Sequence, residues 1–367
     1  MLASAFLLQL IGMLCVLHLT SAPLEAAELF QIEIDQVPVF GVTAMVGAVA
    51  SSLLAGQIFE LQKPRHVFVG CYVLLAVGIG FSASGVLWTG YLGALIIGIS
   101  YGMVNPVTAV MLNSIQTQRP GLVFSIKQSS VPVAAGLALA IGYLAAATSS
   151  LLVFVIPVLL IVMGLILKPR GFPDSVAIQR PIGPVSIWSD PHLRYTLPIG
   201  LLLGSVQMIV LTVLPSILLN SEIAPSRIYL FLTLAAVAGF LGRLFWGWLA
   251  DRVGLSESLG YLCGLCTLCC GGALLGTQWF VWLLPAFGFL AVGWNGVFMA
   301  LVRGDAPEHA ASASGSVMAY VFLGGILGPL IFAQATDLAG LNGGLLLAGC
   351  VALTAMMFAR RKSHHTG

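Results

Sequence analysis

Long apolar runs constrain the fold of this chain more than any other feature. Twelve runs of mostly apolar residues are each about 19 to 26 residues long, enough to cross a hydrocarbon layer of about 30 Å as a helix. A hydrophobic content of 59%, a charged content of 8% and a mean hydropathy of +1.03 exceed what a soluble core needs. We therefore predict an all-α membrane protein. The expected spans are 2–22, 37–58, 66–87, 89–113, 121–146, 149–168, 195–218, 228–250, 257–277, 279–302, 311–334 and 341–359.

The uneven distribution of basic residues predicts the orientation. If the N-terminus is cytoplasmic, twelve of the fifteen Lys and Arg residues lie on the inner side and the outer loops hold only Arg227, in line with the positive-inside rule. Both termini are then expected in the cytoplasm. The inner bases are Lys63, Arg65, Arg119, Lys168, Arg170, Arg180, Arg194, Arg252, Arg303, Arg360, Arg361 and Lys362.

The first span is predicted to be a retained helix rather than a secretory signal. No basic residue precedes it, and another membrane span follows instead of a soluble domain. Because this helix begins almost at Met1, we expect a short cytoplasmic tail to precede Met1.

The longest hydrophilic connection divides the chain into two halves of six spans. We predict an N-terminal six-helix bundle over 1–168, a cytoplasmic linker over 169–194 and a C-terminal six-helix bundle over 195–367. Residues that match at a fixed offset favour a parallel repeat between the halves. Gly56 and Glu60 match Gly247 and Asp251 at 191 positions, while Gly98 and Asn105 match Gly288 and Asn295 at 190 positions.

The sequence Gly247-Trp248-Leu249-Ala250-Asp251-Arg252-Val253-Gly254 resembles the loop signature of the major facilitator superfamily, which recurs after the second and eighth of twelve helices. Further stretches resemble one bacterial branch of that superfamily whose substrates are poorly defined. The resemblance implies a permease with twelve transmembrane helices in two pseudo-symmetric bundles, in the bacterial cytoplasmic (inner) membrane. These further stretches are Asn105-Pro106, Phe124-Ser125-Ile126-Lys127-Gln128, Val131-Pro132, Gly293-Trp294-Asn295-Gly296-Val297-Phe298 and Gly328-Pro329.

The loop signature is predicted to act as a conformational latch. Gly247 lets a neighbouring helix approach closely, and Asp251 is suited to accept hydrogen bonds from the N–H groups at a helix N-terminus. The alternative is that Asp251 and Arg252 only mark the water boundary. In the first half, Glu60 replaces the usual Asp, so that copy departs from the pattern. The predicted latch residues are Gly247, Asp251, Arg252, Gly254, Gly56 and Glu60.

Two basic residues inside the predicted spans suggest the substrate class. Lys127 and Arg243 have no acidic partner within a span, so an organic anion would balance their charge. The alternatives are that Lys127 snorkels to the headgroups and that Arg243 makes internal structural hydrogen bonds. Efflux of hydrophobic drugs remains the other candidate function.

Neutral side chains complete the predicted substrate site. Asn105, Gln128, Gln207 and Asn295 each donate and accept hydrogen bonds, which suits a polar ligand near the bilayer midplane. Trp294 and Tyr101 are candidates for its walls. The alternative is interhelical hydrogen bonding, worth about 0.6 kcal/mol per contact on average.

The sequence lacks residues that several classes of function require. None of the thirteen acidic residues falls well inside a predicted span, and Leu301 stands where relatives of this branch often carry a Glu. The coupling ion therefore stays open, with proton, sodium, exchange and uniport all possible. No Gly-x-x-x-x-Gly-Lys-Ser/Thr run is present, so direct ATP drive is excluded.

No cluster of catalytic groups appears, and we predict no enzyme, no cofactor and no nucleic-acid partner. The cysteines of the ninth span rotate around the helix at their spacing and predict packing rather than a metal site. The expected partners are a small-molecule substrate and the lipid bilayer, with the protein as a monomer. These cysteines are Cys263, Cys266, Cys269 and Cys270.

Overall fold

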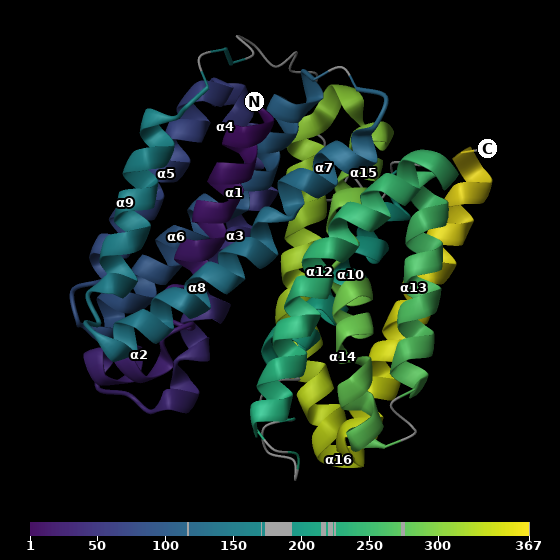
Figure 1. Ribbon diagram of the computed structural model, residues 1–367. Coiled ribbons are helices and arrows are strands. Elements are labelled where there is room, and N and C mark those ends of the chain that lie inside the picture. The colour runs from purple at the N-terminus through teal and green to yellow at the C-terminus, as the bar shows by residue number, and fades with distance from the viewer. Residues whose placement is uncertain are drawn as a thin grey trace. The chain divides into compact units, whose positions relative to one another are not determined.

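Apolar helices occupy nearly all of the described chain, as the long hydrophobic runs require. In the computed structural model (Figure 1), the described residues are 1–115, 117–169, 171–172, 193–213, 218, 223, 225–272 and 276–366. Within them, helical residues lie in each of the twelve predicted spans. Six helical stretches there are long and apolar enough to cross a membrane, or seven if the bent pair α3 and α4 forms one span.

The helices have the following bounds within the described residues. In chain order they are α1 (Leu2–Leu17), α2 (Pro23–Phe30), η1 (Ile34–Gln36), α3 (Pro38–Leu53), α4 (Ala55–Leu61), α5 (Pro64–Ser82), α6 (Leu87–Asn113), α7 (Pro120–Gln128), α8 (Ser130–Ala147), α9 (Leu152–Ile166), α10 (Thr196–Met208), the π-helical η3 (Ile209–Val213), α12 (Pro225–Val253), α13 (Leu255–Gly272), α14 (Thr277–Ala291), α15 (Asn295–Asp305), η5 (Pro307–His309) and α16 (Ala310–Thr366).

Proline and glycine set several of these boundaries. Proline stands in the first turn of α2, α3, α5 and α7, where its missing N–H leaves no helical hydrogen bond unmade. Gly254, with φ of +105°, separates α12 from α13, and Gly340, with φ of +67°, interrupts α16. Both angles lie in the region that favours glycine. The break at Gly340 falls between the two spans predicted for this part of the chain.

The chain forms two compact units. Unit 1 comprises 1–116, 130–186 and 306–319, and unit 2 comprises 117–129, 187–305 and 320–367. The division differs from the predicted bundles in two segments, 117–129 and 306–319, which are themselves about 190 positions apart in the sequence. The bundle boundaries at 168 and 195 stay predictions, and most of the predicted linker lies outside the described residues.

Equivalent close helix contacts occur within each unit. In unit 1, a Cβ on Gly98 of α6 would clash with the carbonyl oxygen of Ala44 on α3. In unit 2, a Cβ on Gly288 of α14 would clash with the carbonyl oxygen of Ala235 on α12. Ala44 and Ala235 are 191 positions apart, so both sides of this contact recur at the repeat offset. Glycine is required here because the two backbones touch.

The fourth and tenth predicted spans contain the most enclosed segments among the helices that qualify as membrane spans by length and hydropathy. An 18-residue window within each of the stretches 87–113 and 280–305 is 83% buried, whereas the corresponding windows of the other qualifying spans are 39–56% buried. Side chains of these two stretches therefore face protein rather than lipid over most of their length. Asn105 and Asn295, the symmetric pair in the sequence, lie on these two enclosed stretches.

Candidate functional site

Arg243 is the centre of the candidate substrate site in unit 2. Its side chain on α12 is fully buried. The Nε atom donates a hydrogen bond of 2.9 Å to the carbonyl oxygen of Val292, and Nη1 donates another to the carbonyl oxygen of Gln128. One guanidinium thus connects α12 with the end of α7 and with the turn that joins α14 to α15. Arg243 makes the structural hydrogen bonds that the sequence left as one alternative.

Lys127 places a second positive charge in the same site. It lies on α7 next to Gln128, is 1% exposed and interacts electrostatically with Arg243. An ammonium group that snorkels to lipid headgroups would be exposed, which Lys127 is not. Desolvating an ion costs several kcal/mol, and like charges in a low dielectric repel each other. The two buried cations therefore make the electrostatic potential of this region positive.

Buried polar atoms on the neighbouring helix α15 belong to the same region. Trp294 and Asn295 are both buried where α15 begins, and a Cβ on Gly296 would clash with Ser125 of α7. Among the described residues, Trp294 Nε1, Asn295 Oδ1 and Ser125 Oγ have no hydrogen-bond partner. Buried polar groups in native proteins usually have partners, and a ligand or a water molecule could supply them here.

The remaining predicted substrate residues are distributed over both units. Gln207 lies on α10 of unit 2, where its Oε1 has no hydrogen-bond partner among the described residues. Asn105 and Tyr101 lie on α6 of unit 1, and both are buried. The hydroxyl of Tyr101 accepts a hydrogen bond of 2.9 Å from Gln9 Nε2 on α1. Sequence reasoning missed Gln9, although an amide inside an apolar helix was a signal for it.

Asp251 makes the contact that was predicted for the latch. Its Oδ1 accepts a hydrogen bond of 2.7 Å from the backbone N–H of Gly121, and its Oδ2 accepts one of 2.9 Å from that of Leu122. Both N–H groups belong to the first turn of α7, where a helix presents free donors and positive potential. A Cβ on Gly247 would lie 2.7 Å from the carbonyl oxygen of Gly121, so glycine allows this approach.

The other residues of the loop signature have distinct environments. The Arg252 guanidinium lies 3.7 Å from the ring centroid of Trp248, a cation–π contact at the end of α12. Gly254 supplies the left-handed residue that ends this helix. In the first-half copy, Gly56 and Glu60 lie on α4, and Glu60 is exposed with no hydrogen-bond partner among the described residues. The two copies therefore differ in this structure.

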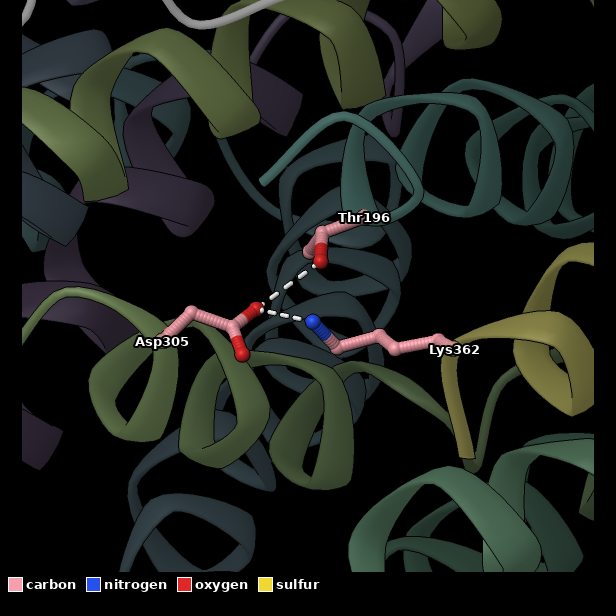
Figure 2. Close-up of polar contacts among 3 residues, drawn as sticks. All are labelled: Thr196, Asp305 and Lys362. Atoms are coloured by element: carbon pink, nitrogen blue, oxygen red, sulfur yellow. Dashed lines mark hydrogen bonds and ion pairs between the residues drawn. The ribbon is translucent and has the colours of Figure 1, made fainter. Parts of the chain in front are cut away.

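A polar cluster that the sequence did not predict joins three helices of unit 2. Figure 2 shows Asp305 of α15 between Lys362 of α16 and Thr196 of α10. Lys362 Nζ lies 2.6 Å from Asp305 Oδ2, and the Thr196 hydroxyl donates to the same oxygen at 2.9 Å. Asp305 and Lys362 are 57 positions apart in the sequence, so no local sequence pattern predicts that they pair.

Metal binding receives no support from the described residues, which contain no group of three or more His, Cys, Asp or Glu able to hold an ion. The cysteines of α13 are buried among apolar helices, and Cys269 Sγ contacts the carbonyl oxygen of Leu283 at 3.9 Å. They pack in the interior of unit 2.

Comparisons with known proteins agree with this architecture. Similar solved structures include a variant of the E. coli fucose:proton symporter FucP (15% identity, TM-score 0.79, covering 99% of this chain and 98% of that one). The human organic anion transporter MFSD10 is 15% identical, with a TM-score of 0.72 and 98% of each chain covered. The proton:xylose symporter XylE is 15% identical, with a TM-score of 0.74 and coverage of 98% and 94%. At such identities the likeness shows the fold alone.

A search of curated proteins found no match. The family profile described as Major Facilitator Superfamily matches residues 2–329, nearly the whole chain. Together with the all-helical fold, the match shows that the chain belongs to the Major Facilitator Superfamily and is a multi-pass membrane transporter.

Proposed function

We propose that this chain is a secondary transporter that moves a small organic anion across the membrane by alternating access. The observation that carries the proposal is the pair of buried cations, Lys127 on α7 and Arg243 on α12. A carboxylate or similar group would balance their charge, with Lys as a point charge and Arg as a donor fork. We assign the charge contact with the substrate to both cations, because both are buried in the same region of unit 2.

Neutral groups beside these cations support a polar solute. Asn295 Oδ1 can accept a hydrogen bond and Trp294 Nε1 can donate one, and neither atom has a partner among the described residues. A hydroxylated or amidated anion would match this mixture better than a fully apolar compound. One structural neighbour is named an organic anion transporter and two are named sugar symporters, so drug efflux, the alternative function, is not favoured.

The latch has a role in the proposed transport cycle. We infer that the Asp251 contact with the first turn of α7 forms in one conformation and breaks in another, which biases the equilibrium between them. Gly247 lets α12 approach α7 closely enough for this contact, because a Cβ there would clash with Ser125 and Gly121. The exposed Glu60 of the first-half copy would then gain its partner only in a different conformation.

The same proposal includes the topology predicted from the sequence. We propose twelve transmembrane helices in two pseudo-symmetric bundles, 1–168 and 195–367, as the family implies. The distribution of basic residues supports a cytoplasmic location for both termini and a location in the inner membrane of a bacterium. We propose that the protein works as a monomer with a small-molecule substrate.

Ligand-dependent thermal stability, followed by counterflow of a labelled ligand, tests the substrate class. Purified protein would be screened in detergent against organic anions, sugars, amino acids and hydrophobic drugs, because a ligand that binds the folded state raises its stability. We expect anions to stabilise the wild type and to drive counterflow in proteoliposomes. Lys127→Met, which keeps length but removes the buried charge, should abolish both effects.

Arg119→Met is a matched control, because it removes an exposed positive charge just before α7. It should respond to anions as the wild type does. Stabilisation by sugars with no effect of Lys127→Met would replace the anion proposal with sugar transport. Stabilisation by apolar drugs alone would instead favour efflux, and an anion response that survives Lys127→Met would refute the role of this lysine.

A further inference from the structure

A groove on the surface of unit 1 lies where α5 and α9 meet. Its volume is about 620 Å³. Three of its lining residues have basic side chains: Arg65 and His66 at the start of α5, and Lys168 just after α9. All three are exposed, and no acidic residue lines the groove among the residues that the structure describes. The groove is therefore positively charged.

The floor of the groove is apolar. Val69, Gly70 and Val73 of α5 lie below the bases, and Gly70 has open space on its side-chain face, where a Cβ would have no atom within 4 Å. Exposed Val73, Val77 and Phe81 then follow at four-residue intervals. Because residues four apart lie on one helix face, they form an apolar strip that continues from the bases along α5.

Contacts between α5 and α9 hold the walls of this groove in place. A Cβ on Gly164 of α9 would lie 2.5 Å from the ring of Tyr72 on α5, so the helices touch there. Phe172 packs edge-on against Phe68 at 5.1 Å between ring centroids. The two helices also lie side by side in Figure 1. The groove is thus a feature of two packed helices rather than of a loop.

The corresponding place in unit 2 has different side chains. Helix α13 begins 191 positions after α5, and the end of α16 is tied to it because Ser363 donates a hydrogen bond of 2.6 Å to Glu257 Oε1. Tyr261 stands at the position that corresponds to Gly70. At this place the second half therefore has an acidic residue, Glu257, and a bulky residue, Tyr261. The first half has the basic residue His66 and Gly70 at the matching positions.

We propose that the α5–α9 groove binds an anionic phospholipid. Its phosphate would lie between Arg65 and Lys168, and one acyl chain would follow the strip of Val73, Val77 and Phe81. Basic pockets between transmembrane helices on the cytoplasmic side suit anionic headgroups, and the orientation proposed above places this groove there. A phospholipid fits both parts of the surface, whereas a soluble anion would leave the apolar strip unused.

Native mass spectrometry of the full chain, titrated with phosphatidylglycerol and separately with phosphatidylcholine, tests the proposal. The wild type should bind phosphatidylglycerol more tightly. Arg65→Gln combined with Lys168→Gln should weaken that binding about 30-fold, which corresponds to about 1 kcal/mol for each base removed. The control is Arg360→Gln combined with Arg361→Gln, which removes the same charge from exposed positions near the end of α16 and should leave the affinity unchanged.

Two further arms separate a lipid groove from general electrostatic attraction. Gly70→Phe keeps every charge but fills the floor, so it should also weaken phosphatidylglycerol binding. Millimolar inorganic phosphate should not displace the lipid, because it cannot use the apolar strip. Equal affinity for the two lipids, equal loss in both double variants, unchanged binding in Gly70→Phe, or displacement by phosphate would each overturn the proposal. The assay needs no transport, so its failure is separate from that of the proposed function.

Discussion

Replacing Asp251 by Asn should destabilise unit 2 measurably. The carboxylate accepts two hydrogen bonds, from Gly121 at 2.7 Å and from Leu122 at 2.9 Å. A hydrogen bond to a charged group contributes about 1.5–3 kcal/mol, and a negative charge at a helix N-terminus adds about 0.3–1 kcal/mol. Asn keeps one acceptor oxygen but presents N–H groups to the second donor. We therefore expect a loss of about 2–3 kcal/mol.

Thermal unfolding with a thiol-reactive fluorophore is a suitable assay for this variant. The dye reacts when buried cysteines become accessible, and α13 in unit 2 carries four of them. Cys350 is exposed, so a Cys350→Ser background removes the signal from the folded state. At about 2–4 °C per kcal/mol for domains of this size, Asp251→Asn should lower the unfolding midpoint by about 4 to 12 °C.

Glu60→Gln provides the matched control for Asp251→Asn. It makes the same chemical change at the corresponding position of the first half, where the carboxylate is exposed and has no hydrogen-bond partner among the described residues. Its midpoint should equal that of the parent. If Asp251→Asn shifts the midpoint no more than Glu60→Gln does, the hydrogen bonds to α7 contribute nothing measurable and the reasoning is wrong.

Two further changes probe the packing and the polar cluster of unit 2. Gly288→Val should sharply reduce the yield of monodisperse protein in size-exclusion chromatography, because any Cβ there meets a backbone carbonyl, whereas Gly271→Val faces open space and should behave as the wild type. Asp305→Asn or Lys362→Met alone should destabilise by about 3–5 kcal/mol, since each leaves a buried partner charge. The double variant should recover much of that loss in thermal unfolding, and a fully additive loss would argue against the ion pair.

Much of the fold follows from local properties of the sequence. Apolar length predicts the helical segments of the twelve spans but not α2 (Pro23–Phe30), which lies between the first two of them, and the first-turn prolines and Gly340 show where helices begin and break. The repeat offset that pairs Gly98 with Gly288 led to equivalent close contacts in both units. These features are visible in the sequence because hydropathy, turn chemistry and backbone conformation depend on residues that are near one another in the chain.

The candidate site was predicted only in part. The composition of the spans singled out Lys127 and Arg243, and the structure brings them into electrostatic contact. The composition did not indicate that the Arg243 guanidinium donates hydrogen bonds to the carbonyl oxygens of Val292 and Gln128, because a backbone acceptor can belong to any residue type. Ser125 was missed for a related reason, since a serine in an apolar helix often satisfies its own backbone.

The sequence by itself determined a set of apolar helices, their approximate ends, the repeat and the superfamily signature. Only the tertiary structure decided which helices meet: α7 lies with α12 in unit 2, Asp251 caps α7, and Asp305 pairs with Lys362. The physical reason is that lipid and helix interior are similarly apolar, so hydropathy does not specify helix partners. Shape at glycines and scattered polar groups selects them, and those contacts join residues that are distant in sequence.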